Sequence, residues 1–200
     1  MIPGMAGLIP AAGFSSRMGA CKPLLRLGRK TIIERVIDLF RTQDITDILV
    51  VLGHGAPWLT DLVESSGARW IVNEDYREDM FSSVKIGVRH LCPDCRAFFL
   101  LPVDFPLVRS KTLVVLADAF LSSGMGICRP CYRNRKGHPP LISSALIKDM
   151  LDYEGREGMR SFLSGYEGST IDVDCDDPGI LLNLNHPEDY KIACDMLKEI

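Results

Sequence analysis

A stretch of small residues and two cations follows the apolar segment 5–11. Ala12 and Gly13 lack bulky side chains, so a ligand can approach the backbone amides closely at this point. Arg17 can bind two phosphate oxygens with its planar guanidinium, and Lys22 adds a mobile positive charge. A solvated surface loop would explain any one of these residues but not their combination. The glycine spacing matches neither a P-loop nor a dinucleotide fingerprint, so we expect another kind of phosphate-binding loop.

A single carboxylate ends another apolar run, in the segment LPVDFP at 101–106. Asp104 has a proline on either side of it in this segment. One interpretation is a turn aspartate that accepts hydrogen bonds from the next backbone amides. The other is a ligand for Mg²⁺, which favours one or two carboxylates together with phosphate oxygens. Beside a phosphate-binding loop, the metal interpretation is favoured.

The elements that must position these residues alternate between apolar runs and helical patterns. The runs do not alternate in polarity, which is typical of parallel strands covered on both faces by helices. We expect strands over 5–11, 47–53, 68–73, 96–104 and 124–131, and helices over 31–41, 57–66, 80–91 and 110–122. Thr31 and Glu34 form a capping box that starts the first helix, which leaves 12–30 as a loop of about nineteen residues. The pattern predicts a doubly wound, mostly parallel Rossmann-like sheet in three α/β/α layers.

The remainder of the chain has a less regular pattern. It predicts a basic hairpin over 132–138, helices over 143–151, 157–163 and 187–198, and short strands over 170–173 and 180–184. No linker or repeat interrupts it, so we expect one domain over 1–200.

Composition and charge exclude several classes of function. Apolar residues make up 46% of the chain and charged residues 24%, with a net charge of -3. The charge disfavours non-specific binding to nucleic acid. No apolar run reaches the length of a membrane span, and the start lacks the basic region of a signal peptide, so we expect a cytoplasmic protein.

The seven cysteines include two CxxC pairs, Cys92 with Cys95 and Cys128 with Cys131. Such pairs can bind zinc. The first pair precedes a strand and the second lies at the far end of another, about 15–20 Å away across a parallel sheet. We therefore expect reduced, structural thiols.

Four segments, AAGFSSRMGACKPLL, LPVDFP, GHPPLI and NHPEDY, resemble the molybdenum cofactor nucleotidyltransferase group in their order and spacing. The similarity is greatest to its CTP-using cytidylyltransferase branch and covers nearly the whole chain. It implies that the first loop wraps the nucleotide and that Asp104 binds Mg²⁺, while Arg17 and Lys22 contact phosphates and act in catalysis. The nucleotide-binding residues that it implies are Ala11, Ala12, Gly13, Ser15, Ser16, Arg17, Gly19, Lys22, Asn73, Ser82 and Ser83.

The resemblance implies that the domain over 1–200 is a nucleotidyltransferase domain, with 1–131 as its nucleotide-binding half and 132–200 as its acceptor-binding and closing half. It also implies an acceptor site and a further metal ligand. Gly137 and His138 match a family turn near the acceptor, although His138 could equally be a loop histidine. Asn185 stands where many family members have a second metal-binding aspartate, and an N-cap of the last helix is its other interpretation. Asp79 replaces a glycine that is usual in the family.

The reaction implied is transfer of CMP from CTP to the terminal phosphate of molybdopterin, or of the molybdenum cofactor, with release of pyrophosphate. Ala-Ala-Gly at 11–13 is typical of CTP users, whereas Asn185 is typical of GTP users. The alternatives are a guanylyltransferase for the same cofactor, a cytidylyltransferase for a sugar or polyol phosphate, and a non-catalytic cofactor carrier. A molybdoenzyme that receives the cofactor is a further expected partner.

Overall fold

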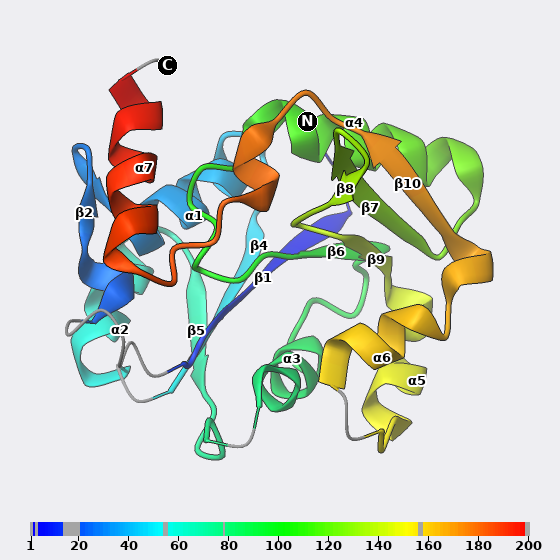
Figure 1. Ribbon diagram of the computed structural model, residues 1–200. Helices are drawn as coiled ribbons and strands as arrows, with labels where there is room; N and C mark the ends of the chain where they lie inside the picture. Colours follow the sequence, from blue (N-terminus) through cyan, green and yellow to red (C-terminus); the bar gives the residue numbers. More distant parts are fainter. Residues whose placement is uncertain are drawn as a thin grey trace.

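A mostly parallel sheet forms the centre of the molecule, and helices cover both of its faces (Figure 1). The computed structural model describes residues 2, 4–13, 21–53, 56–77, 79–155 and 158–198. In this part of the chain the strand order is β10-β7-β9-β6-β1-β4-β5, with β8 paired to β7. The strands are β1 (Met5–Ala11), β4 (Asp47–Leu52), β5 (Arg69–Val72), β6 (Ala97–Leu100), β7 (Ile127–Tyr132), β8 (Arg135–Lys136), β9 (Leu141–Ser143) and β10 (Thr170–Asp174).

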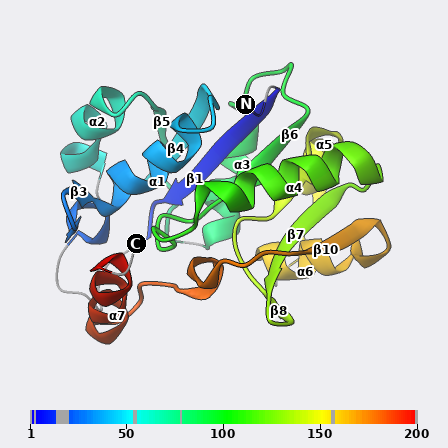
Figure 2. The same ribbon diagram turned by 90° about the horizontal axis from the view of Figure 1, so that it is seen from above.

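The helices form two layers, one on each face of the sheet, and each layer packs against the sheet through its own apolar core. One core takes side chains from α1 (Ile32–Arg41), α2 (Ala56–Ser65), α4 (Ser110–Ser123) and α7 (Pro187–Lys198). The other takes them from α3 (Met80–Val88), α5 (Ile147–Asp152) and α6 (Gly158–Ser164). Figure 2 shows α1 and α4 over the sheet, with α3 and α5 behind it. The predicted three-layer α/β/α fold is confirmed.

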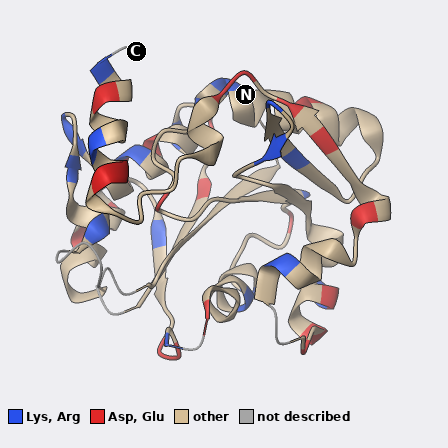
Figure 3. Ribbon diagram, viewed as in Figure 1, with Lys and Arg blue, Asp and Glu red and all other residues tan. Residues whose placement is uncertain are grey.

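The central strands are apolar because helices cover them on both sides. Every residue of β1 is buried, as are all four of β6, and Figure 3 shows no charged residue on β1. β1 pairs in parallel with both β4 and β6. Charged side chains can therefore lie close to the central strands only at the strand ends, where the burial is incomplete. No helix in the described ranges is long and apolar enough to cross a membrane.

One prediction for the second half of the chain is wrong, and one strand was not predicted. The helix expected over 143–151 is confirmed as η2 (Ser144–Leu146) followed by α5. The short strand β9, which inserts antiparallel between β6 and β7 just before this helix, was not predicted. In place of the strand expected over 180–184, residues 180 and 181 end the 3₁₀ turn η4 (Pro178–Leu181), and residues 182–184 form no strand. The Asp177 carboxylate starts this turn by accepting a 2.9 Å hydrogen bond from Gly179 N, and Pro178 at its first position favours it.

The segment predicted as one loop over 12–30 contains short elements in its described part. It contains η1 (Lys22–Leu24) and an antiparallel pair, β2 (Arg26–Leu27) with β3 (Lys30–Thr31). Gly28 turns between the two strands at a φ of 71°. The hairpin expected over 132–138 is confirmed: Arg133 and Asn134, at φ values of 50° and 63°, connect β7 to β8.

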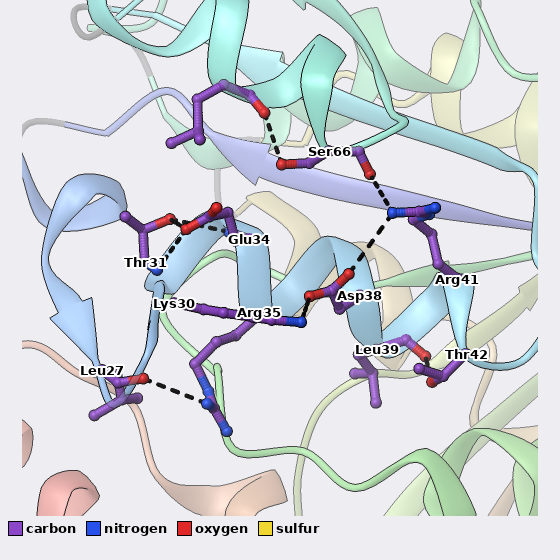
Figure 4. A network of polar contacts seen from close by, with 11 residues as sticks. Leu27, Lys30, Thr31, Glu34, Arg35, Asp38, Leu39, Arg41, Thr42 and Ser66 are labelled. Carbon is purple, nitrogen blue, oxygen red and sulfur yellow. Dashed lines mark hydrogen bonds and ion pairs between the residues drawn. The ribbon is translucent and has the colours of Figure 1, made fainter.

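The start of α1 confirms the capping box. Figure 4 shows Thr31 and Glu34 bonded to each other at the head of the helix. The Glu34 carboxylate accepts from Thr31 N at 2.7 Å, and Thr31 Oγ1 accepts from Glu34 N at 3.4 Å. Lys30 and Arg41 pair with Asp38 further along the same face. We call Lys30, Thr31, Glu34, Asp38 and Arg41 the α1 network.

Candidate active site

The carboxyl ends of the parallel strands form one rim of the sheet. Ala12 follows β1, Gly53 follows β4, Asn73 follows β5, and Asp104 follows the extended end of β6. A Cβ atom on Gly53 would lie 2.6 Å from Ala12 O, so only glycine allows the first two ends to approach this closely. Ala12 is buried and Gly13 is exposed. The rim is thus the place where the first predicted loop and the predicted metal ligand meet, as in other open α/β sheets.

Three side chains from distant parts of the chain converge on this rim. Lys22 Nζ lies 3.2 Å from Asp104 Oδ2 and donates a 3.4 Å hydrogen bond to Asn185 Oδ1. The Lys22 side chain is only 10% exposed and that of Asp104 is 27% exposed. We call Lys22, Asp104 and Asn185 the rim cluster. The sequence predicted a role for each of these residues, and the structure brings all three together.

Backbone hydrogen bonds hold each member of the rim cluster in place. Leu24 N donates to Cys21 O at 2.9 Å, which shapes the 3₁₀ turn around Lys22. Leu184 N donates to Asp104 O at 3.0 Å and ties the segment before α7 to the end of β6. These bonds bring a lysine, an aspartate and an asparagine to one point from three separate segments.

The N-terminus of α7 leaves the Asn185 side chain free to face Lys22. Asp189 Oδ2 accepts hydrogen bonds from Asn185 N at 2.9 Å and from His186 N at 2.7 Å. Asp189 therefore satisfies the two backbone amides that precede α7, whereas the Asn185 side-chain oxygen accepts from Lys22 Nζ. The N-cap interpretation of Asn185 stays a prediction.

Burial and charge act on Asp104 in opposite directions. Burial raises the pKa of the Asp104 carboxyl above its ordinary value, and the Lys22 ammonium partly opposes this shift. A carboxylate that is poorly hydrated gains more from a nearby cation than an exposed one does. The rim cluster therefore has a strong need for positive charge beside Asp104.

The predicted pocket residues at the end of β5 form a connected group. Asn73 is fully buried, and its Nδ2 donates to Ser82 Oγ at 2.9 Å and to Ser83 Oγ at 3.0 Å. Its Oδ1 accepts from Asp75 N at 2.9 Å. Because the Asn73 amide is fully engaged, it joins β5 to the start of α3, and its predicted contact with nucleotide stays a prediction. Asp79 caps α3 by accepting from Ser82 N at 2.7 Å, which gives this departure from the family pattern a structural reason.

The predicted acceptor turn packs directly against the segment of Asp104. The ring of His138 lies 4.3 Å from that of Phe105, centroid to centroid. A Cβ atom on Gly137 would lie 2.6 Å from Ile180 O, so the turn requires glycine there. Burial lowers the pKa of His138, which keeps the imidazole neutral at physiological pH. Within the described residues, neither His138 Nδ1 nor Asn183 Oδ1 has a hydrogen-bond partner, although both atoms are buried.

Four predicted residues lie outside the described ranges: Ser15, Ser16, Arg17 and Gly19. Two residues of the site, Gly53 and Asn183, were not predicted. The position of Gly53 directly after an apolar run was a signal that could have identified it.

The two CxxC pairs occupy different parts of the sheet, as predicted. Cys92 N donates to Asp47 Oδ2 at 2.8 Å, at the amino end of β4, whereas Cys128 and Cys131 lie within β7. Burial raises the pKa of Cys95 to about 11, so this thiol stays protonated at neutral pH. Across the described ranges, no three His, Cys, Asp or Glu side chains form a group that could hold a metal ion.

The donor set of the rim cluster nevertheless fits Mg²⁺ bound together with a nucleotide. Asp104 offers a carboxylate and Asn185 a neutral amide oxygen, and both oxygens already face one cationic group. Mg²⁺ commonly binds through one or two protein oxygens and completes its octahedron with water and phosphate. Asp104 and Asn185 could therefore hold the ion if phosphates supplied the remaining ligands.

Comparison with known proteins finds relatives that match nearly the whole chain. The chain is 27% identical to molybdenum cofactor cytidylyltransferase of Escherichia coli K12 over 194 residues, which cover 96% of this chain and 97% of that one. A crystal structure of an Rv0371c homologue from Mycobacterium sp. strain JC1 superposes with a TM-score of 0.85 at 22% identity over the whole of both chains. Rv0371c of Mycobacterium tuberculosis H37Rv, in complex with manganese, has a TM-score of 0.73 at 21% identity over 96% of this chain and 98% of that chain.

A domain family also matches most of the chain. Residues 7–171 match the MobA-like NTP transferase domain, a range that runs from within β1 into β10 and includes Lys22, Asp104 and the Asn73 group. The chain belongs to the family of MobA-like NTP transferases, and its fold and family are those of a nucleotidyltransferase.

Proposed function

We propose that this protein transfers CMP from CTP to the terminal phosphate of molybdopterin or of the molybdenum cofactor and releases pyrophosphate. The observation that carries the proposal is the rim cluster, in which a buried lysine and a carboxylate face one another beside the end of β1. Nucleotidyl transfer needs positive charge near the α-phosphate and a carboxylate that can hold a divalent ion.

The chain's own residues would act by position and charge. The acceptor phosphate is largely ionised at neutral pH because its second pKa is about 6, so the reaction needs no general base. Lys22 would stabilise negative charge that develops on the α-phosphate, and Arg17 would hold the leaving pyrophosphate. Asp104, helped by Asn185, would hold Mg²⁺, which neutralises phosphate charge when it is bound. A divalent ion is consistent with the manganese complex of the fold relative Rv0371c.

The acceptor side of the site would lie along Phe105 and His138. His138 Nδ1 and Asn183 Oδ1 are buried polar atoms that lack hydrogen-bond partners in the described part of the chain. A neutral imidazole and an amide oxygen suit a substrate with N–H or O–H donors, such as a pterin, better than they suit bare phosphate. Such a contact would require a small rearrangement, since both atoms are buried in the free protein.

The choice of CTP follows from two independent indications. The chain carries Ala11, Ala12 and Gly13 after β1, the version typical of CTP users. The full-length relative from E. coli is a cytidylyltransferase. Asn185 is the one residue that favours GTP, so GTP is the competing nucleotide that has to be measured.

The test is pyrophosphate release by the purified chain with Mg²⁺, molybdopterin, and CTP, GTP or ATP in turn. We expect release that depends on both CTP and molybdopterin, at least about tenfold faster than with GTP, and a cytidine dinucleotide product by mass spectrometry. Faster turnover with GTP would make the protein a guanylyltransferase. Release only with a sugar or polyol phosphate would change the acceptor, and binding of molybdopterin without any release would indicate a carrier.

A further inference from the structure

One ammonium group lies between the two oxygens that are candidates for binding a divalent ion. Lys22 Nζ is 3.2 Å from Asp104 Oδ2 and 3.4 Å from Asn185 Oδ1. Both distances are those of direct contacts, and the Lys22 side chain is largely shielded from water. In the free protein, Lys22 therefore supplies the positive charge that these two oxygens require.

A divalent ion cannot join this arrangement without displacing the lysine. Mg²⁺ approaches its oxygen ligands to about 2.0–2.1 Å and requires near-octahedral geometry around itself. An ammonium already in contact with both oxygens blocks that approach and also repels the ion, and the repulsion is stronger where water is scarce. Lys22 and the metal are thus alternatives for the same oxygens.

We propose that Lys22 closes the divalent-cation site until a nucleoside triphosphate arrives. The triphosphate offers Lys22 a stronger anionic partner, so the ammonium leaves Asp104 and Asn185, and these oxygens become available to the ion that accompanies the nucleotide. The inference rests on the proposed function for the identity of the triphosphate. It makes a separate claim about the free protein: the metal binds poorly until Lys22 has moved.

The test measures binding of Mn²⁺ alone, without nucleotide or acceptor, by the electron paramagnetic resonance signal of the free ion. Four proteins form a cycle: wild type, Lys22→Met, Asp104→Asn and the double variant. We expect Lys22→Met to bind Mn²⁺ about tenfold or more tightly than wild type, because one adjacent positive charge is gone. Asp104→Asn should change Mn²⁺ affinity little in the presence of Lys22 and should abolish the gain in its absence.

A matched control and a second variant guard against indirect effects. Lys30→Met removes a lysine that also pairs with an aspartate, Asp38, but lies in the exposed α1 network; it should leave Mn²⁺ affinity unchanged. Lys22→Gln keeps a polar side chain and replaces Lys22→Met if the latter fails to fold by circular dichroism.

Two results would overturn the proposal. One is equal Mn²⁺ affinity in wild type and in the Lys22 variants, and the other is a wild type that binds Mn²⁺ at least about tenfold more tightly than Asp104→Asn. Neither result depends on nucleotidyl transfer. A protein that transfers CMP but shows no coupling would refute this inference alone, and one that shows the coupling without transfer would refute only the proposed function.

Discussion

Lys30 with Asp38, and Lys22 with Asp104, are two lysine–aspartate pairs in very different surroundings. The first belongs to the α1 network, where the residues are 8 positions apart and the Lys30 side chain is 53% exposed. Figure 4 shows this network along the surface of one helix. The second belongs to the rim cluster, where Lys22 is 10% exposed and also contacts a residue 163 positions away.

The Lys30–Asp38 pair joins residues that are close in the sequence, whereas the Lys22–Asp104 pair depends on the tertiary fold. An exposed pair gains little from its charges, typically less than about 1 kcal/mol, because water screens them. Burying a lysine and an aspartate loses hydration that their attraction only partly restores. The raised pKa of Asp104, which burial causes, is a sign of that loss. Buried charges at the end of parallel strands are therefore better explained by a ligand than by stability.

The largest contrast should come from the two aspartates. Asp104→Asn should abolish pyrophosphate release, by about a thousandfold or more, because it removes the carboxylate proposed to bind the metal. Its free energy of unfolding at pH 7 should stay close to that of wild type, because the gain from removing a poorly hydrated carboxylate is offset by the buried Lys22 ammonium that loses its partner. Asp38→Asn should leave the rate within about twofold of wild type. Steady-state rates and urea unfolding of both variants measure this, and a wild-type rate in Asp104→Asn would remove Asp104 from the chemistry.

The two lysines give the next contrast. Lys22→Ala should lower kcat for CMP transfer by about two to three orders of magnitude, the usual loss when one strong contact to the transition state is removed. Lys30→Ala should leave kcat unchanged, because Lys30 lies in the α1 network and contacts no member of the rim cluster. Saturation kinetics with CTP separate kcat from KM. An unchanged kcat in Lys22→Ala would mean that this lysine only binds substrate or only shields Asp104.

Asn73 sharpens the comparison because it is buried and polar but uncharged. Asn73→Ala should lower the free energy of unfolding by about 2 kcal/mol, since it leaves Ser83 Oγ without its partner in the interior and removes the bond from Asp75 N. Chemical denaturation measures the loss. A variant with wild-type stability but weaker CTP binding would instead show that Asn73 contacts the nucleotide and does not brace the pocket.

Much of this architecture could be predicted from the sequence because the signals are local. Uninterrupted apolar runs predicted β1, β4 and β6, and the capping box predicted the first residue of α1. β9 was missed because three residues are too few to establish a period of two against the helix that follows. The turn η4 was mistaken for part of a strand because its apolar residue Ile180 is buried in the core without pairing with another strand.

The candidate site divides in the same way between local and non-local information. The placement of Lys22 and Asp104 at strand ends followed from local pattern, and their roles stay predictions. Their direct contact, and the contact of Lys22 with Asn185, depends on three segments that only the tertiary fold joins. A local sequence pattern gives no distance between residues on separate segments. The position of the Lys22 ammonium against the two proposed metal-binding oxygens could therefore not be predicted from the sequence.

The capping box tests the other half of the comparison, the claim that the α1 network serves stability alone. Thr31→Ala should lower the free energy of unfolding by about 1 kcal/mol, because Glu34 N loses its acceptor at the helix start. The rate of CMP transfer at saturating substrate should not change. Thermal or urea unfolding checks the first expectation, and a rate that fell by more than about threefold would connect α1 to the active site.

The smallest effect concerns the titration of His138. This effect on stability is absent at neutral pH and develops only in acid. Burial lowers the pKa of His138 below the ordinary value of 6.5, so the folded protein resists a proton that the unfolded chain accepts. The stability that this group contributes is therefore complete above pH 6.5 and declines as the pH falls from there towards the folded pKa. His138→Phe keeps a ring against Phe105 and removes the titration. Urea unfolding of both proteins between about pH 8 and pH 5 should show wild type losing stability relative to this variant only in acid. A constant difference across that range would mean that His138 is already as easily protonated in the folded protein as in water, and that the acceptor side of the rim is open to solvent.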